Sequence, residues 1–130
     1  MKPELQYLAW TAALTALFWI PYVLERIMKW GVRDAVGYPA NPPAQAPWAV
    51  RMKAAHANAI ENLAVFATLV LVAELANIAN ATTAQAAAIY FWARLVHVIA
   101  YTLGLPWLRT LAFAGGFVAQ VMVALQLIGR

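Results

Sequence analysis

Two rows of polar residues interrupt stretches of the sequence that are otherwise apolar. The first row consists of Arg51, Ala54 or Ala55, Asn58, and Glu61 or Asn62. The second row consists of Tyr90, Arg94, His97 and Tyr101. Residues three or four apart share one side of a helix, so each row predicts a polar helix face. Arginine forks bind carboxylates, and a carboxylate binds an ammonium group. The rows therefore suit a small ligand that carries several carboxylates and an amino group.

Two further cationic side chains, Lys53 and Arg109, are expected at the same end of the molecule as the two polar rows. In this interpretation the arginines bind the ligand's carboxylates and Glu61 binds its ammonium group. Tyr101 or Arg109 would stabilise an anion that develops during a reaction. Because the chain contains no cysteine, any reactive thiol must come from the ligand.

A purely structural interpretation of the two rows stays open. Buried polar pairs also fix the register of helices, in which case the rows bind nothing. A lone interior histidine such as His97 is more often a satisfied core residue than a base, and His56 is expected to be solvated near the membrane surface. With two histidines and no cysteine the sequence offers only a weak metal site, and we predict no metal.

The composition indicates the environment in which these rows lie. Of the 130 residues, 65% are hydrophobic and 11% are charged, whereas ordinary globular proteins have roughly 45–50% and about 25%. A water-soluble domain of this length would leave much of that apolar content exposed. Disordered chains, disulfide scaffolds and coiled coils are excluded. We predict an all-α integral membrane protein, and the net charge of +4 is not taken as a sign of nucleic-acid binding.

Four apolar stretches of about twenty residues match the ~30 Å hydrocarbon core of a bilayer. They are residues 5–24, 54–73, 84–103 and 110–129. The prediction is a single domain over residues 1–130, folded as a four-helix bundle of left-handed antiparallel spans. A cleavable signal peptide is the alternative for the first stretch, which is too long and lacks a convincing cleavage site.

The connections differ in length and chemistry. Residues 25–53 are predicted to form a long loop, because proline at high density excludes helix and strand interiors. The prolines are Pro39, Pro42, Pro43 and Pro47. Residues 74–83 read as a turn whose Asn and Thr side chains cap the next helix. The last stretch carries small residues four apart, a stripe interpreted as ordinary helix packing. These pairs are Ala112 with Gly116, and Gly115 with Ala119.

The distribution of basic residues predicts the orientation. The first and third connections carry Arg26, Lys29, Arg33, Arg51, Lys53 and Arg109. The termini and the second connection carry only Lys2 and Arg130. By the positive-inside bias, the Pro-rich loop faces the cytoplasm and both termini are periplasmic.

The polar rows overlap in depth if the second and third spans run in opposite directions. Counted from the cytoplasmic side, Glu61 lies about 10 Å deep, Arg94 about 13 Å and His97 about 9 Å. A charge near the bilayer centre costs at least ~2.5–3.5 kcal/mol, so charges there turn inward and pair. We therefore predict a buried ion pair between Glu61 and Arg94.

These residues also carry a resemblance. The run R51-M-K-A-A-H-A-N58-A-I-E61-N, followed by R94-L-V-H97-V-I-A-Y101 and by Arg109, resembles the MAPEG family, membrane-associated proteins in eicosanoid and glutathione metabolism. The likeness covers nearly the whole chain and is closest to the short, alanine-rich bacterial form. It implies a homotrimer in which glutathione, a co-substrate, lies at subunit interfaces that open toward the cytoplasm.

The resemblance also implies roles for particular residues. Asn58 and Glu61 would contact the backbone or amino group of glutathione, His97 and Tyr101 would line the site, and Arg94 would support Glu61. Arg109 matches the arginine that stabilises the glutathione thiolate in the conjugating members of the family, although its spacing from Tyr101 differs by one residue. Ala54 and Ala57 depart from polar residues of the family, and Arg51 or Lys53 would have to compensate. A basic residue of a neighbouring subunit's first loop would be Arg26, Lys29 or Arg33.

The leading functional hypothesis is a bacterial inner-membrane enzyme that transfers glutathione to lipophilic electrophiles or reduces hydroperoxides. Its site residues would be Arg51, Asn58, Glu61, Arg94, His97, Tyr101 and Arg109, with Tyr101 and Arg109 catalytic. Its partners would be membrane lipids, a lipophilic substrate and two further copies of the chain. The rival hypothesis is a non-catalytic membrane scaffold or accessory subunit of a larger complex. A proton or ion pathway through Glu61, Arg94 and His97 is a third possibility.

Overall fold

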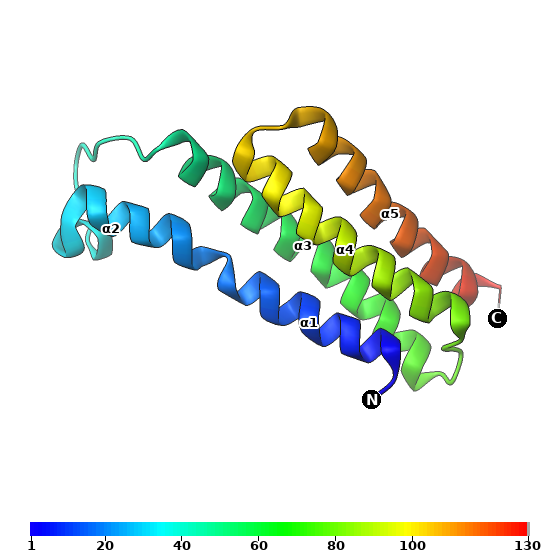
Figure 1. The fold of residues 1–130 in the computed structure, drawn as a ribbon. Coiled ribbons are helices and arrows are strands. Elements are labelled where there is room, and N and C mark those ends of the chain that lie inside the picture. Colours follow the sequence, from blue (N-terminus) through cyan, green and yellow to red (C-terminus); the bar gives the residue numbers. More distant parts are fainter. Residues whose placement is uncertain (130) are drawn as a thin grey trace.

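The computed structural model describes residues 1–129, and every regular element in that range is a helix (Figure 1). The helices are α1 (Pro3–Leu17), α2 (Trp19–Val36), α3 (Pro47–Leu75), α4 (Ala81–Leu103) and α5 (Pro106–Ile128). Because α1 and α2 form one bent rod, the described chain has four helical segments long and apolar enough to cross a membrane. The prediction of an all-helical chain with four such segments is confirmed.

The bend in the first segment lies at Phe18, between α1 and α2. Pro21 has no amide hydrogen to donate to the carbonyl of Leu17, four residues earlier, and a proline inside a helix bends it for this reason. A second break occurs within α2 at Gly31, whose φ of 79° and ψ of 159° are not helical. Beyond Phe18, α2 packs against α3 and hardly touches α4, whereas α1 packs against both.

The expected loop over residues 25–53 is wrong in extent. Helix α2 continues to Val36 and α3 begins at Pro47, so the irregular connection covers only residues 37–46. Charged residues such as Glu25 and Arg51 mark where an apolar stretch ends, but a helix can continue beyond it into a polar environment. Pro47 occupies the first turn of α3, where a missing amide hydrogen removes no helical hydrogen bond.

The connection between α3 and α4 is capped as the sequence predicted. Asn80 is the N-cap of α4: its side chain accepts from the Thr83 amide, and the Thr83 hydroxyl accepts from the Asn80 amide. Both free amides are therefore satisfied by a reciprocal capping pair. Nearby, Lys2 Nζ lies 2.8 Å from the Glu74 carboxylate, which ties the amino terminus to the end of α3.

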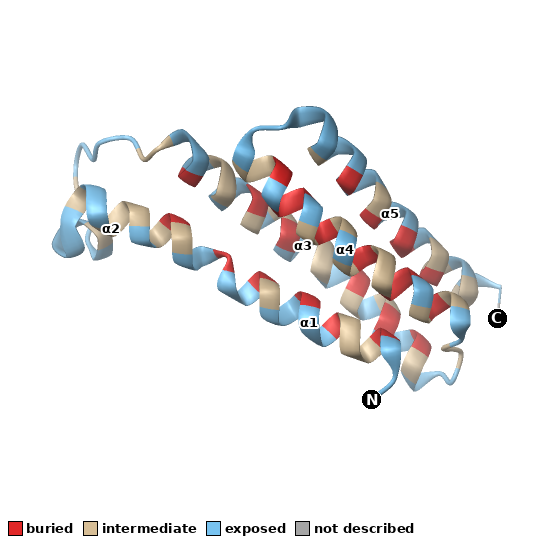
Figure 2. Cartoon of the chain, in the orientation of Figure 1, coloured by how far each residue is buried: buried red, intermediate tan, exposed pale blue. Residues whose placement is uncertain are grey.

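Helices α4 and α5 form the most extensive helix contact in the fold. Gly116 lies against Arg94 and Tyr90, and Gly115 lies against Ala93, so the small residues of α5 allow close approach to α4. This outcome confirms the packing interpretation of that stripe. The ring of Tyr90 stacks on Phe66 of α3, with 3.8 Å between ring centroids. Buried residues line the facing sides of these helices (Figure 2).

The bundle has two distinct ends. The amino terminus, the end of α5 and the α3–α4 connection lie at one end, and the α2–α3 and α4–α5 connections lie at the other (Figure 1). Arg51 of the first polar row and Arg109 lie at the second end, and this is where the candidate site is found.

Candidate functional site

Two neighbouring cavities lie at the end of the bundle where α4 turns into α5. The deeper cavity, of about 160 Å³, is lined by Asn58, His97, Tyr101, Arg109, Thr110 and Phe113. The outer cavity, of about 270 Å³, is lined by Arg51, Tyr101, Gly104, Leu105, Pro106 and Arg109. They share Tyr101 and Arg109, so these two side chains stand on the boundary between an inner and an outer compartment.

The Arg109 guanidinium lies over the ring of Tyr101, with 5.0 Å from its carbon Cζ to the ring centroid. A cation over an aromatic face is attracted by the ring's quadrupole, and the contact fixes the direction of a long flexible side chain. Tyr101 in turn meets the edge of His97, with 5.6 Å between the ring centroids. These three residues form a continuous wall from the surface into the bundle.

His97 is the most deeply placed member of this wall. Only 2% of its surface is exposed, and its Nδ1 atom is buried without a hydrogen-bond partner among the described residues. Its other neighbour is Phe113 of α5, 6.3 Å away between ring centroids. An imidazole enclosed by aromatic rings with an unsatisfied nitrogen is a polar contact point for a molecule that enters the deeper cavity.

Arg51 approaches the outer cavity from α3. Its Nε donates to the backbone carbonyl of Thr102 at 3.0 Å, and its terminal Nη groups form no hydrogen bond within residues 1–129. The position depends on Gly104, where φ is +75°: a Cβ atom there would lie 3.3 Å from Arg51 Cζ. The left-handed glycine thus ends α4 and leaves room for the guanidinium, whose outer edge is available to an anion.

The two polar rows meet through Asn58. Arg94 is 96% buried, and its Nη2 donates to Asn58 Oδ1 at 2.6 Å. The same oxygen accepts from Asn62 Nδ2 at 3.3 Å. Arg94 Nε remains buried without a partner in the described chain. A buried guanidinium is thus held by one neutral amide oxygen, and no acidic group pairs with it among residues 1–129.

The predicted ion pair between Glu61 and Arg94 is wrong for the single chain, because no ion pair joins these two described residues. Glu61 lies on an exposed side of α3, whereas Ala55 and Ala59 form its buried side. Three residues turn a helix by about 300°, so Glu61 is displaced by about 60° from Asn58. In the packed bundle the side of α3 that carries Asn58 faces α4, whereas the side that carries Glu61 is exposed.

Two further residues considered in the sequence analysis, His56 and Lys53, lie away from the cavities. His56 is not a solvated surface residue: it is half-buried, and its Nδ1 forms a 2.7 Å hydrogen bond with the hydroxyl of Tyr22. This contact ties α2 to α3 beyond the bend. Lys53 is exposed and lines neither cavity. Of the two candidates proposed to compensate for Ala54, the structure brings only Arg51 to the site.

The structure adds wall residues that the sequence interpretation did not include. Gly104, Leu105 and Pro106 form the turn that closes the outer cavity, and Thr110 and Phe113 close the deeper one. A Gly-x-Pro turn between two spans is a visible sequence signal for the first group. Phe113 has no such signal, because its apolar neighbours resemble it. No cluster of three or more metal-binding side chains occurs within residues 1–129.

Comparison with known proteins gave a single match to a family. The MAPEG family matches residues 7–129, which covers nearly the entire chain and both polar rows. No curated protein and no solved structure matched the chain. The match agrees with the four membrane-spanning segments and with the resemblance seen in the polar rows. The chain is therefore an integral membrane protein that belongs to the MAPEG family.

Proposed function

We propose that this protein is a membrane-embedded, glutathione-dependent transferase or peroxidase that acts on lipophilic electrophiles. The family is generally associated with glutathione. Five of the seven residues expected at the site line the two neighbouring cavities, namely Arg51, Asn58, His97, Tyr101 and Arg109. The observation that carries the proposal is the placement of Arg109 on the boundary of both cavities, held over Tyr101. A cation at that boundary faces a ligand from either compartment.

Glutathione carries two carboxylates, an ammonium group and a thiol. In the proposal, the free Nη groups of Arg51 bind one carboxylate, because charge-assisted forks give the strongest contacts to planar anions. Arg94 and Asn58 supply a second polar contact deeper in the bundle. Ala54 offers no such group, and the loss of one charge-assisted contact would cost ~1.5–3 kcal/mol. Arg51 is positioned to replace that contact from the neighbouring turn.

The chemical step rests on activation of the thiol. A cation within a few ångström lowers the pKa of a thiol, since it stabilises the thiolate. The proton passes to water, the thiolate sulfur attacks the electrophilic carbon, a carbon–sulfur bond forms and the leaving group departs with its electron pair. With a hydroperoxide, the thiolate attacks the terminal oxygen, the O–O bond breaks, and the departing alkoxide takes a proton from water to become an alcohol. A second glutathione then converts the sulfenic acid to a disulfide and water. Arg109 and Tyr101 serve both reactions.

The proposed assembly is a homotrimer of left-handed, antiparallel four-helix subunits, with glutathione at the subunit interfaces. Two features support an additional copy beside the site. Arg94 has no acidic partner within the described chain, and Glu61 lies on an exposed face of α3 beside Ile60 and Val65. A neighbouring copy packed on that face would bury Glu61 at the interface, near the mouth of a site.

The three basic residues of α2 that were expected to reach a neighbouring subunit differ in their contacts within their own subunit. Arg26 Nε donates to Gln45 Oε1 at 3.3 Å, and its guanidinium lies 5.4 Å from the ring centroid of Trp30. Arg26 is therefore committed within its own subunit. Lys29 and Arg33 are exposed, and we propose that one of them completes the neighbouring site. The charge asymmetry of the connections supports a bacterial inner-membrane location with periplasmic termini.

The decisive experiment is conjugation of a generic aromatic halide by the purified protein, with and without glutathione. Arg109→Ala is expected to lower turnover about 10²-fold, the magnitude typical of removing one group that stabilises a developing anion. Lys53→Ala is the matched control, since this cation lines neither cavity. Full activity in Arg109→Ala would remove Arg109 from the mechanism. An equal loss of activity in Lys53→Ala would mean that the total positive charge, and not the position of Arg109, determines turnover.

A second candidate function is a non-catalytic scaffold in a larger membrane complex. Ala54 and Ala57, which stand where relatives have polar residues, favour it, because both are exposed on α3 and contribute no ligand. Thermal unfolding separates the two candidates: a ligand present at 100 times its dissociation constant adds ~2.7 kcal/mol of stability. A stable protein whose unfolding temperature does not change in millimolar glutathione would favour the scaffold.

A further inference from the structure

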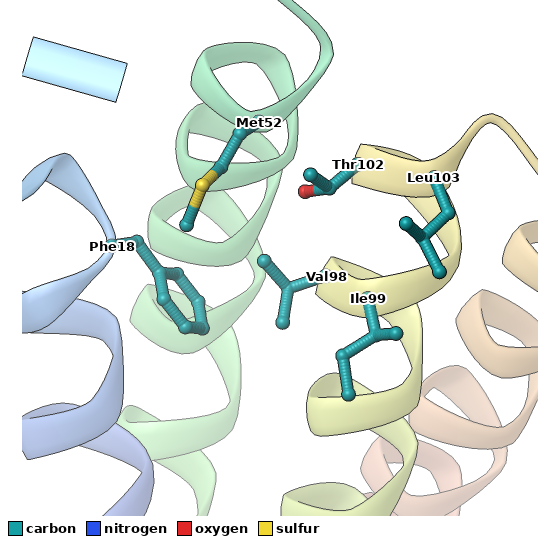
Figure 3. Close-up of a pocket in the computed structure, with 6 residues that line it drawn as sticks. All are labelled: Phe18, Met52, Val98, Ile99, Thr102 and Leu103. Atoms are coloured by element: carbon teal, nitrogen blue, oxygen red, sulfur yellow. The ribbon is translucent and has the colours of Figure 1, made fainter. Parts of the chain in front are cut away.

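A third cavity lies apart from the candidate site, between the bend of the first segment and the paired helices α3 and α4 (Figure 3). Its volume is about 230 Å³, and it is lined by Phe18, Met52, Val98, Ile99, Thr102 and Leu103. The side chains converge on a common space from the bend between α1 and α2, from α3 and from α4 (Figure 3). Its accessible wall is apolar, and the hydroxyl of Thr102 is buried without a hydrogen-bond partner among the described residues.

The cavity arises from the bend at Phe18. Helix α1 packs against α4, but α2 turns away from α4 beyond the bend, and its main helix contact is with α3. The space that α2 would have filled lies beside Val98 and Ile99, and the buried ring of Phe18 closes one side of it. Pro21 is thus the sequence origin of the cavity, because it prevents the helix from continuing straight.

The rim of the cavity faces away from the bundle. Ile99 is 50% exposed and Leu103 is 62% exposed, while Val98 behind them is buried. In a chain with four membrane-spanning segments, an apolar opening on the outer surface meets the hydrocarbon of the bilayer. Trp48 lies one turn before Met52 on the same side of α3 and is partly exposed. A tryptophan in this position marks the polar boundary of a membrane.

This cavity is separate from the proposed glutathione site. Arg51 donates to the Thr102 carbonyl and lines the outer polar cavity, whereas Thr102 itself lines the third cavity. The third cavity shares no lining residue with either of the two polar cavities. For a charged tripeptide the lining side chains offer only the buried Thr102 hydroxyl, so most of its polar groups would lose their hydration without gaining a partner.

We propose that this cavity binds one acyl chain of a bilayer phospholipid, with the lipid's ester region at the level of Trp48. An apolar cavity of about 150 Å³ stays dry and takes up a small hydrocarbon, so a larger one open to lipid is filled by the chain that surrounds it. The last three turns of α2, which lead into the α2–α3 connection, carry Arg26, Lys29 and Arg33, and their charge complements the phosphate of the headgroup. The acyl chain would pack against Phe18, the residue at which α1 bends into α2.

The test uses the full-length protein in lipid nanodiscs that contain a phospholipid with a photoreactive diazirine in its acyl chain. Mass spectrometry of the cross-linked peptides is expected to show labelling at Met52, Val98, Ile99 and Leu103 well above that at Leu125, an exposed residue of α5. Ile99→Trp, which fills the rim, is expected to lower labelling about tenfold or more, the effect of displacing two methylene groups. Leu125→Trp is the matched control and is expected to leave it unchanged.

Several outcomes would overturn the proposal. Equal labelling at the cavity and at Leu125 would mean that the surface is only generally lipid-exposed. Absence of labelling in folded protein would mean that another part of the assembly covers the opening. Loss of labelling when a lipophilic electrophile is added would assign the cavity to the substrate instead. None of these measurements requires glutathione, so their result is independent of the proposed enzymatic function.

Discussion

Arg94 of α4 and Asn58 of α3 are joined by a 2.6 Å hydrogen bond between the guanidinium and the amide oxygen, at a point where the arginine is almost fully buried. This contact links the two polar rows of the sequence. It also shows how the fold tolerates a cation in an apolar bundle, because one short bond to a neutral acceptor replaces part of the lost hydration.

Substitution Asn58→Ala is expected to destabilise the protein by about 1.5–3 kcal/mol, the typical contribution of a hydrogen bond to a charged group. Asn58→Asp should retain the contact, because a carboxylate accepts from the same guanidinium. Thermal unfolding in detergent measures both. Thr68→Ala is the control, since Thr68 is exposed on the same helix and bonds only its own backbone. Equal stability of Asn58→Ala and the native chain would show that Arg94 finds another partner.

Substitution Gly104→Ala is expected to weaken both the α4–α5 turn and the binding of anionic ligands. The left-handed conformation costs an alanine about 1–2 kcal/mol, and the new Cβ would crowd the Arg51 guanidinium at 3.3 Å. Gly31→Ala provides the comparison, because Gly31 has a similar φ but nothing within 4 Å of the added atom. A loss of glutathione affinity in both variants would argue against a specific effect on Arg51.

Gly116 is expected to accept alanine but not valine. An added Cβ would lie 3.5 Å from Arg94 Cδ, an ordinary van der Waals contact, so Gly116→Ala should be neutral or slightly stabilising in a helix. The branched methyl groups of Gly116→Val would overpack the contact with α4 and cost about 1–3 kcal/mol. Size-exclusion chromatography after a heating series gives the order of stability, and tolerance of valine would contradict the close packing.

Removal of the helix cap by Asn80→Ala is expected to cost about 1 kcal/mol, because the Thr83 amide loses its acceptor. Asn77→Gly is a suitable comparison in the same connection. Asn77 has a φ of 58°, which glycine adopts without strain, so this variant should be neutral. Denaturation curves of the two variants should therefore separate, and coincident curves would mean that the connection contributes little to stability.

The pH dependence of conjugation tests the role of Arg109. If the guanidinium stabilises the thiolate, the thiol's pKa in the complex lies below that of free glutathione, and the rate rises with pH until that lower value is passed. In Arg109→Ala the rise should move to higher pH, toward the pKa of the free thiol. Arg109→Lys should restore part of the shift. An unchanged pH profile in Arg109→Ala would assign Arg109 to binding alone.

The apolar stretches and the spacing of the polar residues were sufficient to predict four membrane-crossing helices and two polar faces that meet. Segment length follows from the thickness of a bilayer, and helical periodicity follows from backbone geometry, so neither depends on the rest of the fold. The cap at Asn80 was predictable for the same reason, because its partners lie within the same turn. The ends of the helices were less predictable, since charge marks the membrane boundary and not the end of α2.

The tertiary structure decided which polar side chains of α3 face the neighbouring helix. Periodicity places Asn58 and Glu61 on roughly one side of α3, but the packing of α4 selected Asn58 as the partner of Arg94 and left Glu61 exposed. It also placed Arg51 beside Gly104 and opened the apolar cavity behind Phe18. These contacts depend on the rotation of whole helices about their axes, which is set by the combined packing of many side chains from different segments.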